Sequence, residues 1–318
     1  MWKYAVRRTL IAALVLFLIS VLDFVFINLA PGDPLQAMLP PETATNGANI
    51  QALYQKAGLT DSIPVRYLRW VNEVLHGNFG TSFRTNQPAT TMIGQVVPAT
   101  LLLTVTAKLL ALALGVPLGV LSGLRERSWL DQVGTVFSFV STAIPGFFLA
   151  IVTVFVLAVH LRWFPATGIR SYGQESGPFD VLRHLILPAC VLGVLAAPGY
   201  VRYTRTAVID VLGDDYIRTA RAKGLRERTI IWRHILPNAL MPLITVIGLG
   251  IPALLGGSVL IEQVFAWPGM GQLSINSALY RDYPVFMGTA LFYALVVLVS
   301  SIVTDLAYAV ANPRIRYE

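Results

Sequence analysis

Cysteine and histidine are scarce in this chain of 318 residues, and their scarcity excludes several kinds of site. Cys190 is the only cysteine and lies in an apolar run, so the chain can form no internal disulfide and no cysteine-rich metal centre. The four histidines, His76, His160, His184 and His234, include no pair with the four-residue spacing typical of metal ligands. The sequence therefore predicts no metal site.

Charged residues are also scarce. They make up 13% of the chain, whereas hydrophobic residues make up 55% and the mean hydropathy is +0.64. Soluble domains carry about 25% charged residues, so the apolar excess indicates a protein solvated by lipid. The net charge of +7 does not indicate a nucleic-acid partner, because the basic residues stand at the ends of apolar runs and form no groove with interleaved aromatic side chains.

The short motifs of ATP-binding and nucleophilic enzymes are absent. The chain contains no GxxxxGKS or GxxxxGKT segment and no GxSxG segment. We therefore predict that the chain is not an enzyme, has no catalytic residues and needs no cofactor. Any ATP that drives its activity would be hydrolysed by a separate subunit.

Six apolar segments are long enough, or nearly so, to cross a bilayer as helices. They lie at about residues 9–30, 98–122, 132–160, 185–206, 239–262 and 286–311. The fourth is the weakest because it contains Pro188 and Pro198, but neighbouring helices can satisfy the backbone groups that a proline leaves free. The predicted fold class is an all-α polytopic membrane protein with six transmembrane helices.

The chain divides into three parts on this pattern. Residues 1–30 contain the amino terminus and the first transmembrane helix, which we expect to be retained because no small-residue cleavage site follows it. Residues 31–97 are expected to form an ordered extracytoplasmic segment of short helices. Its apolar residues are expected to cover one another and the mouth of the bundle: Leu53, Val65, Leu68, Trp70, Val71 and Leu75. Residues 98–318 are expected to form a core of five helices with a cytoplasmic loop at 207–238.

Lysine and arginine are distributed unevenly between the loops. Fifteen lie at the amino terminus, at 125–127, between Arg202 and Arg233, and at 314–316, whereas four lie in the short loops opposite. Cytoplasmic loops carry the excess of basic residues, and long segments such as 31–97 translocate largely regardless of charge. Both termini are therefore predicted to be cytoplasmic, in a multi-pass protein of the cytoplasmic (inner) membrane.

The richest signature follows the fourth span and reads GDDYIRTARAKGLRERTIIWRHILPNALMP, residues 213–242. Asp214 and Asp215 suit the start of a short helix, as N-cap and first-turn carboxylate, and Gly224 suits its end. Ala220 and Gly224 are four residues apart, so we expect them to share one face and to leave the backbone open to close approach by another protein. On charge alone, a basic loop that only fixes topology is an equal alternative.

This segment resembles the EAA loop of ABC-importer permeases, in which a Glu-Ala-Ala triplet is followed by a glycine and an Ile-x-Leu-Pro-like tail. Arg218, Thr219 and Ala220 occupy the triplet, Gly224 the glycine and residues 234–237 the tail. The departures from the triplet fit the dipeptide/oligopeptide/nickel branch, whose loops read like YIRTARAKGL. Further motifs similar to that branch are LAPGDP, GLTDSIPVRYLRWVNEVLHGNFGTSF and EQVFAWPGMGQLSINSALYRDYPVF.

The resemblance implies a type I ABC-importer permease fold and a function as the permease subunit of an ATP-driven importer of di- or oligopeptides, with nickel or glutathione as alternative cargoes. The implied partners are a second, homologous permease subunit in a heterodimer, cytoplasmic ATP-binding subunits and an extracytoplasmic substrate-binding protein. The loop would be the coupling helix that docks in a groove of the ATPase. Its implied coupling residues are Asp215, Tyr216, Arg218, Thr219, Ala220, Arg221, Ala222, Lys223, Gly224, His234 and Pro237.

Two functions of other classes stay open at this point. An ion-gradient-driven carrier would need the three ionisable residues within spans, Asp23, Lys108 and Asp305, whereas a structural scaffold would use the basic loop only as a docking point. For the three ionisable residues the first interpretation is a structural pair, in which Lys108 contacts one of the two acids, and the second is a direct role in the passage of substrate.

Gly115, Gly119 and Gly123 repeat every four residues in the second span, and small residues at that spacing let helices pack closely in lipid. Packing within the chain and packing against a second permease subunit are both open. The glycine-rich fifth span is a candidate for lining a pore. Trp267 and Tyr283 stand near span ends, where we expect them to anchor the membrane interface, with contact to cargo as the second interpretation.

Overall fold

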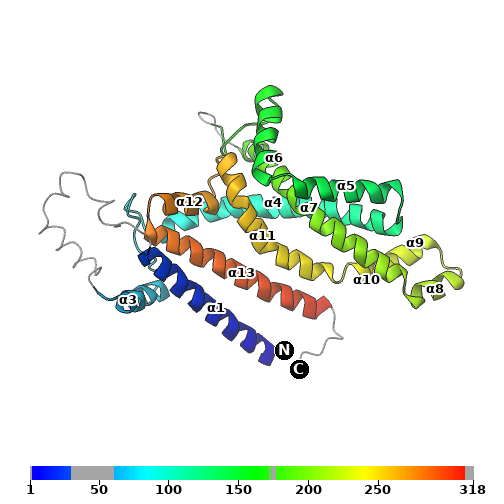
Figure 1. Ribbon diagram of the computed structural model, residues 1–318, viewed down its shortest axis with the longest axis horizontal. Helices are drawn as coiled ribbons and strands as arrows, with labels where there is room; N and C mark the ends of the chain where they lie inside the picture. Colours follow the sequence, from blue (N-terminus) through cyan, green and yellow to red (C-terminus); the bar gives the residue numbers. More distant parts are fainter. Residues whose placement is uncertain (1, 30–60, 172, 174–176, 312–318) are drawn as a thin grey trace, which may run out of the picture. The chain divides into compact units, whose positions relative to one another are not determined.

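A computed structural model describes residues 2–29, 61–171, 173 and 177–311, and the described chain is mainly helical (Figure 1). The LAPGDP motif, Leu53 and residues 312–318 lie outside the described residues. The α-helices are α1 (Trp2–Leu29), α3 (Ile63–Leu75), α4 (Ala89–Leu124), α5 (Trp129–Ala143), α6 (Gly146–Thr153), α7 (Pro178–Leu212), α8 (Asp215–Ala222), α9 (Glu227–Ile230), α10 (Leu236–Ala239), α11 (Leu243–Val264), α12 (Met270–Leu279) and α13 (Tyr283–Ala311). Two π-helical segments, η1 (Val154–His160) and η2 (Ile231–Ile235), continue α6 and α9.

Five helices in the described part of the chain are long and apolar enough to cross a membrane: Val6–Leu29 of α1, the whole of α4, α7 and α11, and Tyr283–Asp305 of α13. A sixth span is reached when α5 and the helix formed by α6 and η1 are counted as one broken span. The predicted all-α polytopic fold is confirmed, and the predicted number of six spans holds on that count.

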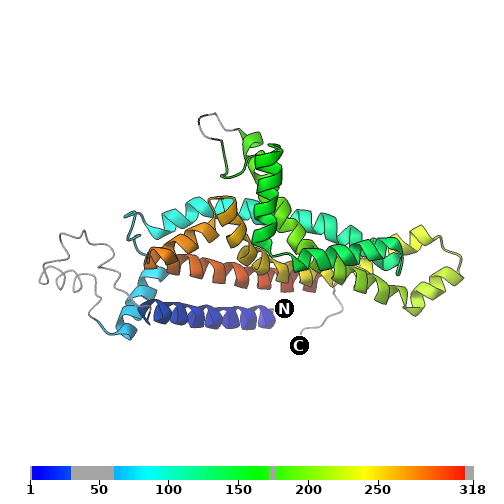
Figure 2. The same cartoon turned by 45° about the horizontal axis from the view of Figure 1, so that its top comes forward.

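The third predicted span is not one continuous helix. α5 and the helix Gly146–His160 are bent by 97° relative to each other, a turn that Figure 2 shows in green. The break falls at Ile144, whose backbone is extended (φ −83°, ψ 123°), and at Pro145. Proline disfavours the helical conformation of the residue before it and donates no backbone hydrogen bond, so α5 ends there. Average hydropathy concealed the break, because one proline barely changes it.

The fourth predicted span, the weakest in sequence, is the best enclosed. α7 runs for 35 residues with Pro188 and Pro198 in its interior. In its most apolar window 56% of the residues are buried, against 11% in α1. The surrounding helices therefore stabilise turns that lack a backbone hydrogen bond, as the sequence interpretation assumed.

The chain forms two compact units. The first contains Met1–Pro98 and Gly269–Leu298, and the second contains Ala99–Pro268 and Val299–Glu318. In the first unit α1 packs on α3 around Tyr67, whose ring centre lies 5.4 Å from that of Phe24. The Tyr67 hydroxyl also shares a hydrogen bond with Ser20 Oγ at 2.8 Å. The mixed aromatic and polar contact fixes α3 on the amino-terminal helix.

A buried carboxylate fastens the segment between α3 and α4 to the turn before α13. Asp282 accepts hydrogen bonds from Ser82 Oγ at 2.5 Å and from the backbone N–H of Phe83 at 3.0 Å. The Arg84 guanidinium lies 4.1 Å from the centre of the Tyr280 ring. In α3 the apolar residues Val65, Leu68 and Leu75 are exposed, so the prediction that they cover one another is wrong. The extent of the extracytoplasmic segment and its side of the membrane stay predictions.

In the second unit, Trp267 and Glu262 tie one end of α11 to α4. Trp267 is fully buried and its indole N–H donates to the carbonyl oxygen of Ala99 at 2.9 Å. The hydroxyl of Thr100 donates to the buried carboxyl of Glu262 at 2.8 Å. Trp267 is thus a core residue, and the predictions that it anchors the membrane interface or touches cargo are wrong. Its single N–H satisfied by a backbone carbonyl is what permits the indole to be buried.

Candidate functional site

The short helix predicted in the basic loop is α8, and its boundaries follow from local sequence. Asp214 has the extended backbone of an N-cap residue (φ −70°, ψ 143°), although its side chain makes no capping hydrogen bond. After the helix, Gly224 adopts a left-handed conformation (φ +75°). Its N–H donates to Arg221 O at 2.9 Å and the Leu225 N–H donates to Ala220 O at 3.3 Å. This pair of bonds is the Schellman motif, so glycine ends the helix as predicted.

α8 is mounted on the end of α7 by an apolar cluster. Ile217 and Ala220 of α8 are buried against Val208 of α7 and against Ile230 and Ile235 of the following segments. Figure 1 shows α8 and α9 directly beyond the end of α7. Because the two buried residues project inward, side-chain packing joins α8 to the end of α7.

The predicted small face made by Ala220 and Gly224 is wrong. Ala220 is 6% exposed and packs inside the chain, whereas a Cβ atom added at Gly224 would meet no atom within 4 Å. The four-residue spacing places both residues on one side of the helix only while the helix continues, and the left-handed turn at Gly224 ends it. Gly224 serves the backbone turn, and Ala220 serves the core.

The exposed side of α8 carries most of the other residues that the sequence singled out: Asp215, Tyr216, Arg218, Thr219, Arg221, Ala222 and Lys223. The Arg221 side chain is oriented by Glu227, with its Nε 2.8 Å from the carboxylate. The Thr219 hydroxyl donates to the Asp215 carbonyl at 2.9 Å. Burial, followed by the Asp214 charge, raises the pKa of the Tyr216 phenol, which therefore stays neutral at physiological pH.

The remaining predicted residues lie on the return segment. His234 is half-buried in η2 and Pro237 is exposed in α10. The His234 carbonyl accepts a hydrogen bond from the Asn238 amide at 2.7 Å. Two large exposed apolar residues lie in the same loop, Leu225 (41%) and Trp232 (65%), and the sequence interpretation missed both. For Leu225 the signal available was an apolar side chain among charged residues, whereas Trp232 follows two isoleucines and had no such signal.

The three glycines of α4 are directed at α7. A Cβ atom added at Gly119 would lie 2.7 Å from the Thr204 Cβ and 2.7 Å from the Val201 carbonyl oxygen, and the same close approach occurs at Gly115 and Gly123. No methyl group fits at such distances without movement of the backbone. Packing within the chain, one of the two sequence interpretations, is confirmed. This stripe is therefore covered and does not form the contact with a second subunit.

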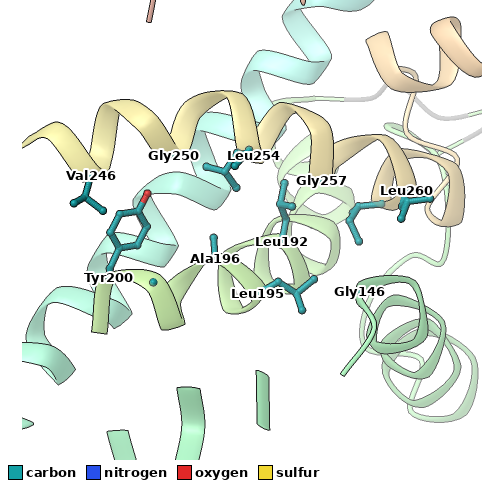
Figure 3. Close-up of a pocket in the computed structure, with 13 residues that line it drawn as sticks. Gly146, Leu192, Leu195, Ala196, Tyr200, Val246, Gly250, Leu254, Gly257 and Leu260 are labelled. Carbon is teal, nitrogen blue, oxygen red and sulfur yellow. The ribbon is translucent and has the colours of Figure 1, made fainter. Parts of the chain in front are cut away.

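On its other side, α7 borders a cavity of about 380 Å³ shared with α6 and α11 (Figure 3). Leu192, Leu195, Ala196, Val246 and Leu254 line it together with Gly146, Gly199, Gly250 and Gly257. The exception to this apolar lining is Tyr200, whose hydroxyl points toward α11. The volume lies within the range of about 300–1,000 Å³ that is usual for small-molecule pockets.

Lys108 of α4 joins three helices at the edge of this cavity. Its amine donates to the Tyr200 hydroxyl on α7 and to the carbonyl oxygen of Ile247 on α11, the latter at 2.6 Å. The amine also lies 5.0 Å from the centre of the Tyr200 ring. Neither acceptor is a carboxylate, so the predicted structural ion pair of Lys108 is wrong.

Two family models match the chain and together cover nearly all of it. The model described as the binding-protein-dependent transport system inner membrane component matches residues 115–317. The model for the N-terminal part of the same membrane component matches residues 1–104.

Relatives of known name align over the whole chain. The chain is 43% identical over 318 residues to the oligopeptide transport system permease protein AppB of Bacillus subtilis, with all of both chains covered. It is 40% identical to a putative peptide permease protein of Brucella suis, with 99% of each chain covered. It is 35% identical to the glutathione transport system permease protein GsiC of Salmonella typhimurium, again with both chains fully covered.

Solved structures share the fold. An inward-facing structure of the MetNI methionine ABC transporter aligns with a TM-score of 0.57 at 20% identity, covering 70% of this chain and 96% of that chain. A crystal structure of an amino acid ABC transporter with histidines aligns with a TM-score of 0.52 at 15% identity, covering 69% and 94%. The predicted likeness to ABC-importer permeases is confirmed at the level of the fold.

Proposed function

The chain belongs to the family of binding-protein-dependent transport system inner membrane components and is the permease subunit of an ABC importer, and from this premise we propose that its cargo is a peptide. The observation that carries the proposal is the end-to-end similarity to an oligopeptide permease and a peptide permease. Glutathione, itself a short peptide-like molecule, is the second candidate, because a glutathione permease also aligns over the full chain.

The ATP-binding subunits dock on α8 in this proposal. Support comes from the exposed side chains of α8, from the Arg221–Glu227 ion pair and from Trp232, which is 65% exposed in the same loop. Aromatic and arginine side chains are enriched among the residues that dominate protein interfaces. The family to which the chain belongs implies an ATPase partner, and the chain itself is not the ATPase.

The mechanical step follows from the way α8 is mounted. When ATP binding moves the ATPase, α8 is displaced and carries α7 with it, because Ile217 and Ala220 are buried at their junction. The glycine stripe of α4 makes α4 move together with α7. The change then falls at the contact of α7 with α11, which borders the cavity and where the hydrogen bond of Lys108 to Ile247 would have to break or shift. Rigid-body movement of packed helices about a looser contact is a common form of switching in proteins.

The orientation and the remaining partners complete the proposal. Both termini and the loop at 207–238 face the cytoplasm, as the distribution of lysine and arginine predicts. A substrate-binding protein delivers cargo from the outer side, toward residues 31–97. A second, homologous permease subunit completes the pore, and its contact surface lies away from the glycine stripe of α4.

Reconstitution tests the proposal. Proteoliposomes that contain the chain, its partner permease and the ATPase subunits, with the binding protein supplied at the outer face, should accumulate a labelled di- or oligopeptide only when ATP reaches the ATPase. Labelled glutathione in the same vesicles measures the second candidate. Peptide uptake by the purified chain alone under an ion gradient would instead identify a carrier, and absence of any uptake together with ATPase binding would identify a scaffold.

A further inference from the structure

The amine of Lys108 is a positive charge within a membrane-spanning helix that is not neutralised by its neighbours. Its two acceptors, the Tyr200 hydroxyl and the Ile247 carbonyl, are both neutral. An ionised group at such depth is expensive and usually faces the protein interior or a water-filled cavity connected with the transported species. No described residue supplies an anion to this amine, so a bound anion is a natural partner for it.

The amine has a hydrogen-bond donor left for that anion. An ammonium group carries three N–H donors, and Lys108 uses two of them within the described structure. The Tyr200 hydroxyl accepts from Lys108, so its own proton remains available to a further acceptor. Two donors, one of them charged, thus lie side by side, an arrangement suited to the two oxygens of a carboxylate.

Gly250 opens these donors to the cavity. Gly250 lines the cavity, and a Cβ atom added there would lie 2.6 Å from the Tyr200 hydroxyl and 2.7 Å from the Lys108 amine. Figure 3 shows the Tyr200 hydroxyl directed at the stretch of α11 that contains Gly250. Tyr200 lines the cavity, whose other walls are aliphatic, and the Lys108 amine lies one hydrogen bond behind the Tyr200 hydroxyl. Without a side chain at Gly250, no methyl group covers either donor.

We propose that Lys108 and Tyr200 bind the carboxylate of the cargo, at the Gly250 edge of the cavity between α7 and α11. The remaining aliphatic walls then contact the apolar body of the cargo. This inference rests on the proposed function: for a peptide the anion is the C-terminal carboxylate. Nickel, a cation, would be repelled at this place. The site therefore favours a cargo that carries a carboxylate over nickel.

The experiment compares one peptide in two forms, with a free and with an amidated C-terminus, in the reconstituted complex. The readout is the ratio of initial uptake of the acid to that of the amide. The binding protein is the same for every variant, so its own preference cancels when these ratios are compared. Lys108→Met should lower the ratio about tenfold or more, the factor expected for loss of a charge-assisted hydrogen bond, whereas Lys108→Arg should retain most of it.

A matched pair of glycine variants provides the second arm. Gly250→Ala places a methyl group against both donors and should also lower the ratio. Gly257→Ala adds the same methyl group to the same helix and cavity, but its nearest neighbour is Leu192 Cδ1 at 3.5 Å, an ordinary contact, so the ratio should not change. This arm applies equally where Lys108→Met does not reach the membrane.

The outcomes separate the two proposals. Wild-type complex that imports neither form of the peptide overturns the proposed function. Wild-type complex that imports peptide, with Lys108→Met or Gly250→Ala importing the acid and amide in the wild-type ratio, overturns only the carboxylate site. In that case the amine serves to hold α4, α7 and α11 together, and its loss would lower the thermal stability of the complex without altering selectivity.

Discussion

The two sides of α7 are built in opposite ways. Toward α4, three glycines bring the backbones so close that a methyl group at Gly119 would lie 2.7 Å from a carbonyl oxygen. Toward α6 and α11, leucines and glycines enclose a cavity of about 380 Å³. The first contact cannot slide without breaking its packing, whereas the second contains unfilled volume beside the buried contact of Leu192 with Leu254. The comparison indicates which helices move as one body during transport.

The contact of α7 with the glycines of α4, the closed side of α7, gives the largest expected effect on stability. Gly119→Ala should destabilise the folded permease by about 3 kcal/mol, because the added methyl group meets backbone and Cβ atoms that cannot rotate away. The measurement is membrane abundance together with the midpoint of thermal unfolding in detergent. Gly256→Ala is the control, since nothing lies within 4 Å of its Cβ position. Equal stability of the two variants would contradict the claim that the glycines of α4 pack tightly on α7.

A buried ion pair extends the closed side to α5. Asp131 is 5% exposed and accepts from both Nε and Nη2 of Arg205 on α7, at 2.5 and 2.9 Å. Asp131→Asn should lower the unfolding free energy by about 2 kcal/mol. That figure is below the range for a fully buried pair because the Arg205 side chain keeps 31% exposure. Arg205→Lys, which keeps the charge but loses the paired geometry, should cost less, and thermal unfolding compares the two.

The junction of α7 with α8 is expected to respond next. Gly224→Val should disturb the end of α8 by about 1–2 kcal/mol, because a side chain is strained at φ +75°. Gly224→Asn tolerates that conformation and is the control. Transport per ATP hydrolysed should fall in the valine variant and stay near wild type in the asparagine variant. Normal coupling with valine would mean that the end of α8 has no part in docking.

The cavity side of α7, toward α6 and α11, gives the smallest expected effect on stability. Gly257→Ala places a methyl group in the cavity, 3.5 Å from Leu192 Cδ1, and should change stability by less than about 0.5 kcal/mol. The value is read in the same thermal unfolding assay as for Gly119→Ala. A loss of stability as large as that of Gly119→Ala would show that the cavity side of α7 is packed as tightly as its contact with the glycine stripe of α4.

Much of this architecture could be predicted from sequence. Hydropathy alone located the spanning helices, because burial in lipid requires long apolar runs, and turn chemistry located the end of α8 at Gly224. The bend of 97° at Pro145 was missed, since a proline within an apolar run can lie inside a continuous helix or end one, as Pro188 and Pro145 respectively show. Which outcome occurs depends on neighbours that the sequence does not reveal.

The surface character of individual residues was harder to predict. Ala220 was expected on an exposed face and is buried, because it packs in one cluster with Ile230 and Ile235 of the return segment, and that packing is a tertiary property. Trp267 was expected at the membrane interface, yet a backbone carbonyl in reach of its N–H allows full burial. Lys108 was expected to pair with an acid and finds two neutral acceptors from helices distant in sequence.

The central claim is that α4 and α7 move together while α7 moves relative to α11. Spin labels test it most directly, in a Cys190→Ser background, at exposed positions Leu109 of α4, Tyr203 of α7 and Leu249 of α11. Distances are measured by pulsed electron resonance in the full complex with and without ATP. We expect the Leu109–Tyr203 distance to stay constant and the Tyr203–Leu249 distance to shift. A shift between Leu109 and Tyr203, or a constant distance between Tyr203 and Leu249, would contradict the account.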